Sequence, residues 1–310
     1  MFPSRFRYEA PHSLDEAIAL LGDGDYVKVL AGGQSLVPMM KLRFASPEML
    51  VDINNVPGLA YHRTDQDGSL RIGALCRHAD LEFSDVLKST QPTMAAAAPL
   101  VADPLVRNRG TLVGSLCHAD PQGDWASVML ALGGSVIAQG PGGRRTIPLA
   151  EFVTGPFQNV LEHDEIAVEA VVPAARGIRS GGYLKLERRV GDFATVGVAV
   201  AIETSRSTET SGDTVTRAGI ALTGVGGSTI GATEAAAALT GGPLTADSIA
   251  AAAELAAAAA QPRTDHRGTA EYKRQLVRVF VKRILNASQR QPTGATGAAG
   301  AAGATEERAA

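Results

Sequence analysis

The pattern of apolar positions divides the chain into an α/β beginning, a mixed middle and an end in which strands precede helices. Residues 13–21 predict a short amphipathic helix, because Ser13 can cap it, Glu16 follows at capping-box spacing, and Gly22 ends the apolar repeat. Further apolar runs predict a strand, a helical turn and a second buried strand over residues 26–31, 35–42 and 49–53. This order predicts a small α/β unit over residues 1–57.

The pattern is mixed over residues 58–175. Strands are predicted at 69–74, 135–139 and 166–172, and helices at 77–83, 93–101 and 124–132. Over residues 176–288, strands at 181–186, 194–202 and 217–225 precede helices at 233–239, 246–260 and 269–287. Strands followed by helices indicate an α+β domain with its helices on one face of an antiparallel sheet. Residues 289–310 contain no large apolar side chain, so we expect a disordered tail.

Composition and charge narrow the function classes. The chain has 310 residues, 45% of them hydrophobic, and its net charge of −3 gives no electrostatic basis for binding nucleic acid or an anionic membrane. No apolar run reaches the roughly 18 residues of a membrane span, and residues 1–7 lack the apolar core of a secretory signal, so we expect a cytoplasmic protein. Cys76 and Cys117 are the two cysteines, and we expect both to be reduced and inert. Four cysteines are needed to hold an iron–sulfur cluster, so any such cluster must belong to a partner.

Two glycine-bearing segments carry the candidate chemistry. The first, Ala31-Gly32-Gly33-Gln34-Ser35, follows a predicted strand, and the second is Thr111-Leu112-Val113-Gly114-Ser115. Backbone without a Cβ can approach phosphate oxygens, and free N–H groups with a hydroxyl can bind a pyrophosphate. Two such loops closing on one cofactor indicate a bound dinucleotide, although a tight turn after a strand would also explain the first pair of glycines. A Rossmann site is disfavoured, because the G-x-G-x-x-G pattern and its acidic partner are missing.

A series of short sequence blocks extends from the first residues to the last predicted helix. It comprises Phe6-x-Tyr8, Pro11-x-Ser13, Ala31 to Leu36, Val51-Asp52-Ile53, Ala102-Asp103-Pro104, Arg109-Gly110-Thr111, His118 to Pro121 with Asp124, Lys185-x-x-x-Arg189-x-Gly191-Asp192-Phe193-Ala194, and Asp265-x-Arg267 with Glu271-Tyr272. In this order the blocks resemble the FAD-binding medium subunit of the molybdenum hydroxylases. That family contains carbon monoxide dehydrogenase, bacterial heterocycle dehydrogenases and, as a fused domain, xanthine dehydrogenase. The resemblance covers nearly the whole chain.

The resemblance implies an α+β fold in three parts. Residues 1–57 and 58–175 would form a two-part FAD-binding region of the vanillyl-alcohol-oxidase (PCMH) type, and residues 176–288 a C-terminal α+β domain of the CO dehydrogenase flavoprotein type. FAD would lie extended between the first two parts. Its pyrophosphate would be wrapped by backbone amides and the Ser35 hydroxyl, within a segment of six residues: Ala31, Gly32, Gly33, Gln34, Ser35 and Leu36.

The second glycine segment would approach the same diphosphate or the ribityl chain. Its implied contacts are Thr111, Gly114 and Ser115, and Ala102 would line the cofactor slot. The family's second segment usually has the sequence Thr-x-Gly-Gly followed by Ser or Asn, whereas Val113 stands at the first glycine position here. A β-branched residue with positive φ would be strained by about 1–2 kcal/mol. We therefore expect Val113 to have an ordinary backbone conformation in a loop that still binds FAD.

Four further residues are implied at the two ends of the cofactor. Asp124 would accept hydrogen bonds from hydroxyl or adenine-side donors, and Leu161 would pack on the adenine. Lys185 would reach flavin carbonyl oxygens, where a cation stabilises negative charge on the reduced ring, and Phe193 would lie near the isoalloxazine. Two simpler explanations stay open: Lys185 could belong to a solvated basic edge, and Phe193 could be a core residue.

The chain itself is not expected to hold a metal ion or a catalytic residue. His118 lies beside Asp120 and Asp124 in the sequence, but no further His or Cys supports a metal site. A hydrogen-bonded loop histidine is therefore favoured.

The implied role is electron transfer within a complex. The resemblance implies a small partner subunit with two 2Fe-2S clusters and a large one with a molybdenum-pterin cofactor, in a dimer of heterotrimers. Electrons would pass from the molybdenum centre through the clusters to FAD and then to an external acceptor. The substrate (carbon monoxide, an N-heterocycle or an aldehyde) and the acceptor stay open. Two other classes also stay open: a self-contained FAD oxidoreductase of the same fold, and a flavin-free scaffold subunit.

Overall fold

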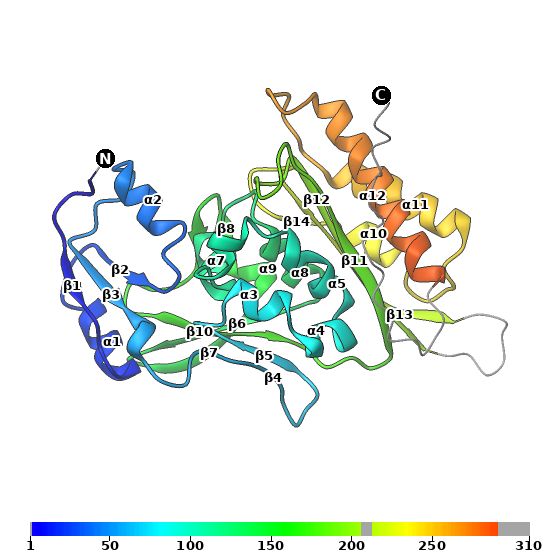
Figure 1. Cartoon of the computed structure of the whole chain (residues 1–310). Coiled ribbons are helices and arrows are strands. Elements are labelled where there is room, and N and C mark those ends of the chain that lie inside the picture. Colours follow the sequence, from blue (N-terminus) through cyan, green and yellow to red (C-terminus); the bar gives the residue numbers. More distant parts are fainter. Residues whose placement is uncertain (1, 206–212, 291–310) are drawn as a thin grey trace, which may run out of the picture.

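The computed structural model describes residues 2–205 and 213–290, which form three parts that follow one another along the chain (Figure 1). The first part is a parallel sheet of three strands in the order β1-β3-β2, with one helix before β2 and one after it. Its elements are β1 Arg7–Glu9, α1 Leu14–Leu21, β2 Val27–Leu30, α2 Leu36–Lys41 and β3 Met49–Asp52. The predicted elements of an α/β unit are therefore present, and its bounds at residues 1–57 stay a prediction.

The cap of α1 shows how the local sequence sets the start of a helix. Ser13 Oγ accepts from the Glu16 N–H (3.2 Å), as predicted, but the Glu16 carboxylate accepts from the N–H of His12 (3.0 Å) rather than from that of Ser13. The helix then buries Ala17, Ile18 and Leu21, which belong to the same core as strand β3.

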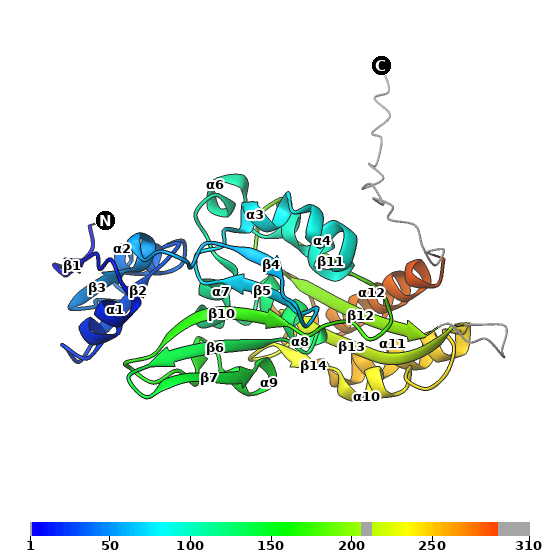
Figure 2. The ribbon, with the colours of Figure 1, turned by 90° about the horizontal axis from the view of Figure 1, so that it is seen from below.

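The second part is an antiparallel sheet of five strands in the order β4-β5-β10-β6-β7, with short helices beside it (Figure 2). Its strands are β4 His62–Thr64, β5 Leu70–Gly73, β6 Ser135–Gly140, β7 Gly143–Pro148 and β10 Ile166–Val172, and a separate hairpin joins β8 Val153–Gly155 to β9 Gln158–Asn159. Its helices are α3 His78–Glu82, α4 Asp85–Thr90, α5 Pro92–Ala97, α6 Pro104–Arg107, α7 Leu112–His118, α8 Asp124–Ala131 and α9 Leu149–Phe152.

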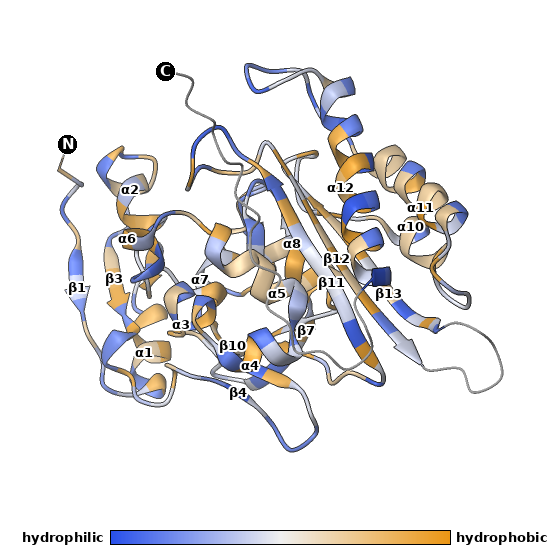
Figure 3. Ribbon diagram, turned by 45° about the vertical axis from the view of Figure 1, so that its right-hand side comes forward, coloured by the Kyte–Doolittle hydropathy of each residue, from blue (hydrophilic) through white to orange (hydrophobic). Residues whose placement is uncertain are grey.

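The third part is an antiparallel sheet in the order β11-β12-β13-β14. Its elements are β11 Ile178–Leu186, β12 Val196–Ser205, β13 Thr214–Thr223, β14 Ile230–Gly231, α10 Thr233–Ala237, α11 Ala246–Ala259 and α12 Ala270–Arg290. Helices α10 and α12 contact the sheet directly, and α11 packs on both of them. Apolar and polar residues alternate along α12, as expected for a helix with one buried face (Figure 3). The predicted helices on one face of an antiparallel sheet are confirmed.

Side chains of β12 alternate between two cores and so join the second and third parts. Val196, Val198, Val200 and Ile202 pack with α10–α12, whereas Ala199 and Ala201 belong to the core shared with the second part. The small side chains let α5 and α8 pack against this other face of the sheet. At Gly219 on β13 a Cβ would lie 1.9 Å from the Ala131 carbonyl oxygen, so the approach of α8 requires glycine there.

The structure differs from the sequence-based prediction mainly at short or polar elements. The apolar pattern does not predict β1, β4, β7, β8, β9, β14, α4, α6 or α9, nor that residues 112–118 form helix α7. Helix α12 continues through Arg290, two residues into the predicted tail, and residues 291–310 lie outside the described residues. Within the described ranges, no helix is long and apolar enough to cross a membrane.

Candidate functional site

The first glycine segment connects β2 to α2 and leaves a row of N–H groups free. Gly33 has a φ of +73°, in the left-handed region that favours glycine. Val37 N–H donates to Gly33 C=O (3.0 Å), and within residues 2–205 and 213–290 the N–H groups of residues 32–36 have no hydrogen-bond acceptor. Ser35 is the N-cap residue of α2, but its hydroxyl makes no capping bond. These donors are therefore available to a ligand.

The segment lines a cavity of about 360 Å³ that also contains two cationic side chains. Ala31 to Gln34 form part of the wall, together with Lys41 from the last turn of α2 and Arg109 from the segment before α7. Free N–H groups beside cations suit an anion such as a diphosphate. This composition is compatible with the diphosphate site expected from the first glycine segment, and the contacts themselves stay predictions.

The second glycine segment is the first turn of α7 and not a loop. Thr111 caps the helix, and its Oγ1 accepts from the Gly114 N–H (3.1 Å). A Cβ at position 114 would lie 2.7 Å from that oxygen, which favours glycine. Val113 is helical and 2% exposed, without positive φ. The expected ordinary backbone of Val113 is confirmed, whereas the expected loop is wrong, because Val113 packs into the core as a helical residue. Ser115 follows in the same helix and is half-buried.

The two glycine segments meet directly. A Cβ on Gly32 would lie 2.5 Å from the Arg109 carbonyl oxygen and 2.7 Å from Gly110 Cα. Arg109 and Gly110 immediately precede Thr111, so the first part of the chain touches the second beside both segments. Only glycine at position 32 permits this approach of two backbones.

His78 is buried next to this contact and should make the free energy of unfolding depend on pH. Trp125 Nε1–H donates to His78 Nδ1 (3.0 Å), and the backbone N–H of His78 donates to the Gly110 carbonyl (2.9 Å). Burial, aided by Arg107 and Arg77, lowers the pKa of His78 from 6.5 to about 4. Below pH 6.5 the unfolded chain therefore binds a proton that the folded chain excludes, so stability falls as the pH falls from 6.5 to 4.

We expect this loss to reach about 3 kcal/mol in the free energy of unfolding once the pH has fallen from 6.5 to about 4. Urea unfolding of the wild type and of His78→Gln at several pH values would measure it. The glutamine keeps an acceptor for Trp125 but cannot be protonated, so the variant should lose this part of the pH dependence. His12→Gln changes an exposed histidine and serves as the control. Equal pH dependence in the wild type and His78→Gln would contradict the prediction.

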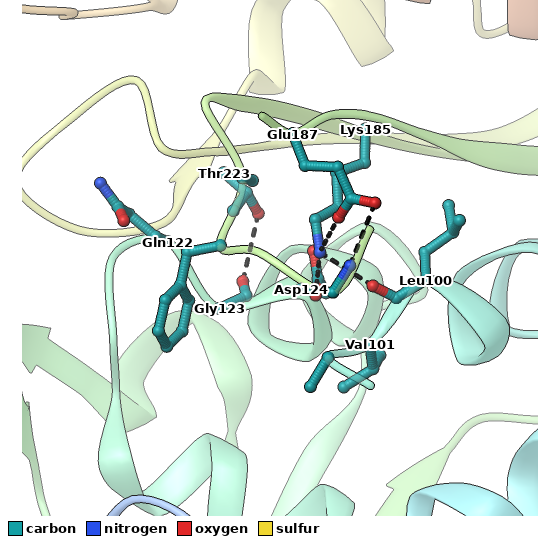
Figure 4. Close-up of polar contacts among 12 residues, drawn as sticks. Leu100, Val101, Gln122, Gly123, Asp124, Lys185, Glu187 and Thr223 are labelled. Carbon is teal, nitrogen blue, oxygen red and sulfur yellow. Dashed lines mark hydrogen bonds and ion pairs between the residues drawn. The ribbon is translucent and has the colours of Figure 1, made fainter. Parts of the chain in front are cut away.

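Asp124 and Lys185 lie together in a closed polar network at the start of α8 (Figure 4). Lys185 Nζ contacts Asp124 Oδ2 (3.1 Å), Glu187 Oε2 (3.2 Å) and the Leu100 carbonyl (2.8 Å), and the lysine side chain is only 1% exposed. Tyr183 donates to the other oxygen of Asp124 (2.6 Å). Burial raises the pKa of Asp124, although Lys185 and Tyr183 oppose that shift. A solvated edge is therefore wrong for Lys185, and the cofactor contacts of Asp124 and Lys185 stay predictions.

Ala102 and Phe193 lie on two loops that touch each other. Ala102 has a left-handed backbone (φ +51°), and a Cβ on Gly191 would lie 3.2 Å from its carbonyl carbon. Phe193 is 51% exposed and so is not a core residue. Leu161 follows the β8–β9 hairpin and is half-buried, with its N–H bonded to Asn159 Oδ1 (3.0 Å).

The remaining candidates for metal or thiol chemistry are few. His118 Nε2 lies 4.0 Å from Asp120 Oδ2, and the His118 ring packs beside Phe157. The described part of the chain contains no group of three His, Cys, Asp or Glu side chains that could hold a metal ion. Burial raises the pKa of both Cys76 and Cys117 to about 12, so neither thiol is activated.

Sequence reasoning misses three basic residues around the glycine segments. Lys41 and Arg109 line the cavity, and Arg77 bonds to the Arg109 carbonyl (2.8 Å). Arg109 belongs to one of the family-like sequence blocks, and Lys41 lies near the end of a predicted helical turn, but nothing local distinguishes either from a solvated charge. Their position becomes apparent only when the first two parts are brought together.

A sequence profile described as the FAD binding domain in molybdopterin dehydrogenase matches residues 4–175, and one described as the CO dehydrogenase flavoprotein C-terminal domain matches residues 182–288. The chain belongs to this flavoprotein family. The carbon monoxide dehydrogenase medium chain of Hydrogenophaga pseudoflava is 42% identical over 289 residues, 93% of this chain and 98% of the relative. The 6-hydroxypseudooxynicotine dehydrogenase complex subunit alpha of Paenarthrobacter nicotinovorans is 39% identical over 286 residues, 92% of this chain and 95% of the relative.

Solved structures agree with the sequence relatives. Carbon monoxide dehydrogenase from Hydrogenophaga pseudoflava matches with a TM-score of 0.86 and 44% identity, over 93% of this chain and 98% of that one. Quinoline 2-oxidoreductase from Pseudomonas putida 86 matches with a TM-score of 0.84 and 30% identity, over 94% of this chain and 99% of that one. The resemblance and the expected fold class are confirmed: this flavoprotein is an FAD-binding medium subunit of the molybdenum hydroxylase type.

Proposed function

We propose that this flavoprotein binds FAD between residues 1–57 and 58–175 and transfers electrons from a partner's 2Fe-2S clusters to an external acceptor. One observation carries the proposal: Gly32 meets the backbone of Arg109 and Gly110 beside a cavity lined by Ala31 to Gln34 and two cationic side chains, in a segment whose N–H groups have no protein acceptor. A site of that composition fits the diphosphate of FAD, and the FAD-binding profile covers both parts.

The diphosphate would be held from both sides. Backbone N–H groups of the six residues Ala31, Gly32, Gly33, Gln34, Ser35 and Leu36, with the Ser35 hydroxyl, would donate from the first part. Thr111, Gly114 and Ser115 would approach from α7, where Thr111 Oγ1 already accepts from Gly114 and keeps its own hydrogen to donate. Lys41 and Arg109 would neutralise the phosphate charge.

The flavin end would lie toward Ala102 and the exposed ring of Phe193, and Leu161 would pack on the adenine. Lys185 would act on the flavin carbonyl oxygens, either by contact once its pair with Asp124 opens or through the backbone, and Asp124 would accept hydrogen bonds from hydroxyl or adenine-side donors. Lys185 holds the Leu100 carbonyl two residues before Ala102, so it also shapes the slot without touching the ring. Bound flavin supplies the ability to take up electrons singly and release two, and the chain needs no catalytic residue of its own for that step.

The proposed partners are a small subunit with 2Fe-2S clusters and a large subunit with a molybdenum-pterin cofactor, assembled as a dimer of heterotrimers. The two cysteines of the chain are too few for a cluster of its own. Several relatives are themselves called medium chain or medium subunit, which supports a complex of this kind. A cytoplasmic location is proposed with it.

We expect the full chain, freed of bound flavin, to bind FAD and to release it in competition with ADP. FMN lacks the second phosphate and the adenosine and should bind at least about 100-fold more weakly, because charge-assisted hydrogen bonds alone contribute about 1.5–3 kcal/mol each. Quenching of flavin fluorescence would measure the affinities for FAD and FMN, and competition with bound FAD would measure the affinity for ADP. Equal binding of FMN and FAD would contradict the diphosphate site. Absence of flavin absorbance after purification with partner subunits would favour a scaffold, and reduction of the flavin by an alcohol without partners would indicate a self-contained enzyme.

A further inference from the structure

A polar connection crosses from the first part to the second beside the glycine segments. Arg77, which precedes α3, donates from Nη1 to the Arg109 carbonyl (2.8 Å) and from Nη2 to Asn54 Oδ1 (2.5 Å). Asn54 follows β3 and donates from Nδ2 to the Ala31 carbonyl (2.9 Å). One guanidinium thus links the backbone before the second glycine segment to the backbone at the start of the first.

Both ends of this connection are fixed by further bonds. Asn54 donates to Asp52 Oδ1 from its N–H (2.9 Å) and from Nδ2 (2.5 Å), and Tyr8 donates to Asp52 Oδ2 (2.6 Å). Arg77 N–H donates to Asp80 Oδ2 (2.8 Å), and the Arg77 backbone pairs with Thr111 in an antiparallel bridge. The Asn54 side chain and the Arg77 backbone are therefore each anchored within their own part of the chain.

The two carbonyls that accept these bonds, those of Ala31 and Arg109, lie at the contact between Gly32 and the backbone of Arg109 and Gly110. In a trans peptide the C=O and the following N–H point in opposite directions, so fixing Ala31 C=O to Asn54 also fixes the direction of the free Gly32 N–H. The Arg109 carbonyl oxygen held by Arg77 is the atom that a Cβ on Gly32 would meet at 2.5 Å. Arg77 and Asn54 therefore act on the spacing of the two backbones as well as on donor direction.

We propose that Arg77 and Asn54 are positioning residues that set the width of the diphosphate cleft. The inference rests on the proposed FAD site and adds to it a pair of side chains that lie behind the two cleft backbones. A planar guanidinium suits this task, because it donates in two directions at fixed angles, which a lysine ammonium does not.

The test uses the full chain, freed of flavin, with Arg77→Lys as the main variant. We expect the Kd for FAD to rise about 10- to 100-fold, since hydrogen bonds from a charged group are lost at both acceptors. Arg63→Lys is the matched control, because Arg63 is exposed and its guanidinium lies over the Tyr61 ring. Urea unfolding of the flavin-free chain separates positioning from folding: Arg77→Lys should still unfold in one cooperative transition, and its Kd is compared with that of the control where both variants are fully folded. An unchanged Kd, or a rise in Kd that only follows a loss of stability, would overturn the proposal.

A second variant covers the case in which Arg77→Lys does not fold. Asn54→Ala should raise the Kd about 10-fold, whereas Asn55→Ala, at the exposed neighbour, should not. The double variant Asn54→Ala/Arg77→Lys should bind no more weakly than the worse single variant, because the two side chains act as one unit. If the effects of the two substitutions on the free energy of FAD binding were fully additive, Arg77 and Asn54 would not act as one unit. If the wild type binds neither FAD nor ADP, the proposed function fails instead, so the two failures are distinguishable.

Discussion

Gly32→Ala should weaken FAD binding about 100-fold, the largest effect on affinity expected of a single methyl group in this protein. The added Cβ would lie 2.5 Å from the Arg109 carbonyl oxygen and 2.7 Å from Gly110 Cα, which are backbone atoms that cannot rotate away. Overpacking of this kind costs roughly 1–3 kcal/mol, and relief requires the two parts to separate. Separation would widen the cleft that the diphosphate has to bridge. Titration of the flavin-free chain with FAD measures the effect.

Two other glycines make the comparison specific. Gly142, in the β6–β7 turn, has nothing within 4 Å of an added Cβ and no positive φ, so Gly142→Ala should bind FAD like the wild type. Gly33 has a φ of +73°, and alanine there should cost about 1–2 kcal/mol, or about 5- to 30-fold in affinity if the strain falls on the bound state. A Gly32→Ala protein with wild-type affinity would show that the close approach is not part of the site.

Much of the fold follows from local sequence, because apolar periodicity and capping act over a few residues. Ser13 predicts the start of α1 for the physical reason that the structure shows, whereas Glu16 accepts from the N–H of His12 and not from that of Ser13. The second glycine segment is the informative failure. Thr111 and Gly114 have the spacing of a helix cap, but glycine inside a first turn lowers helix propensity, so the sequence alone favours a loop. Burial of Val113 among core residues outweighs that preference.

The candidate site is less predictable, because its parts come from distant segments. The glycines indicate a phosphate site from their own local chemistry. Lys41, Arg77 and Arg109 lie in three different segments, and each resembles an ordinary surface charge until the first two parts meet. Lys185 is a different case: it belongs to one of the family-like sequence blocks, and in the structure three protein groups surround its ammonium, so its contact with flavin stays a prediction.

Lys185→Met should lower the free energy of unfolding by about 3–5 kcal/mol, the largest loss of stability expected for a single side chain here. Lys185 is 1% exposed and lies between the carboxylates of Asp124 and Glu187, which are 6% and 17% exposed. Without the ammonium, two negative charges would stay close together in a poorly solvated site, and the Leu100 carbonyl would lose its donor. Urea unfolding of the flavin-free chain measures this loss.

Matched variants separate the effect of the Lys185 charge from that of its packing. They also separate its role in protein stability from a role toward flavin. Lys88→Met removes an exposed partner of Asp85 and should change stability by less than about 1 kcal/mol. Adding Asp124→Asn to Lys185→Met removes one of the stranded charges while keeping an acceptor for Tyr183, so it should restore part of the stability. If Lys185 also touches the flavin, its loss must shift the reduction potential of bound FAD beyond the shift seen with Asp124→Asn alone. If Lys185→Met were about as stable as Lys88→Met, the buried network would be contradicted. Removing the Lys185 ammonium must leave the Asp124 carboxylate in a poorly solvated place.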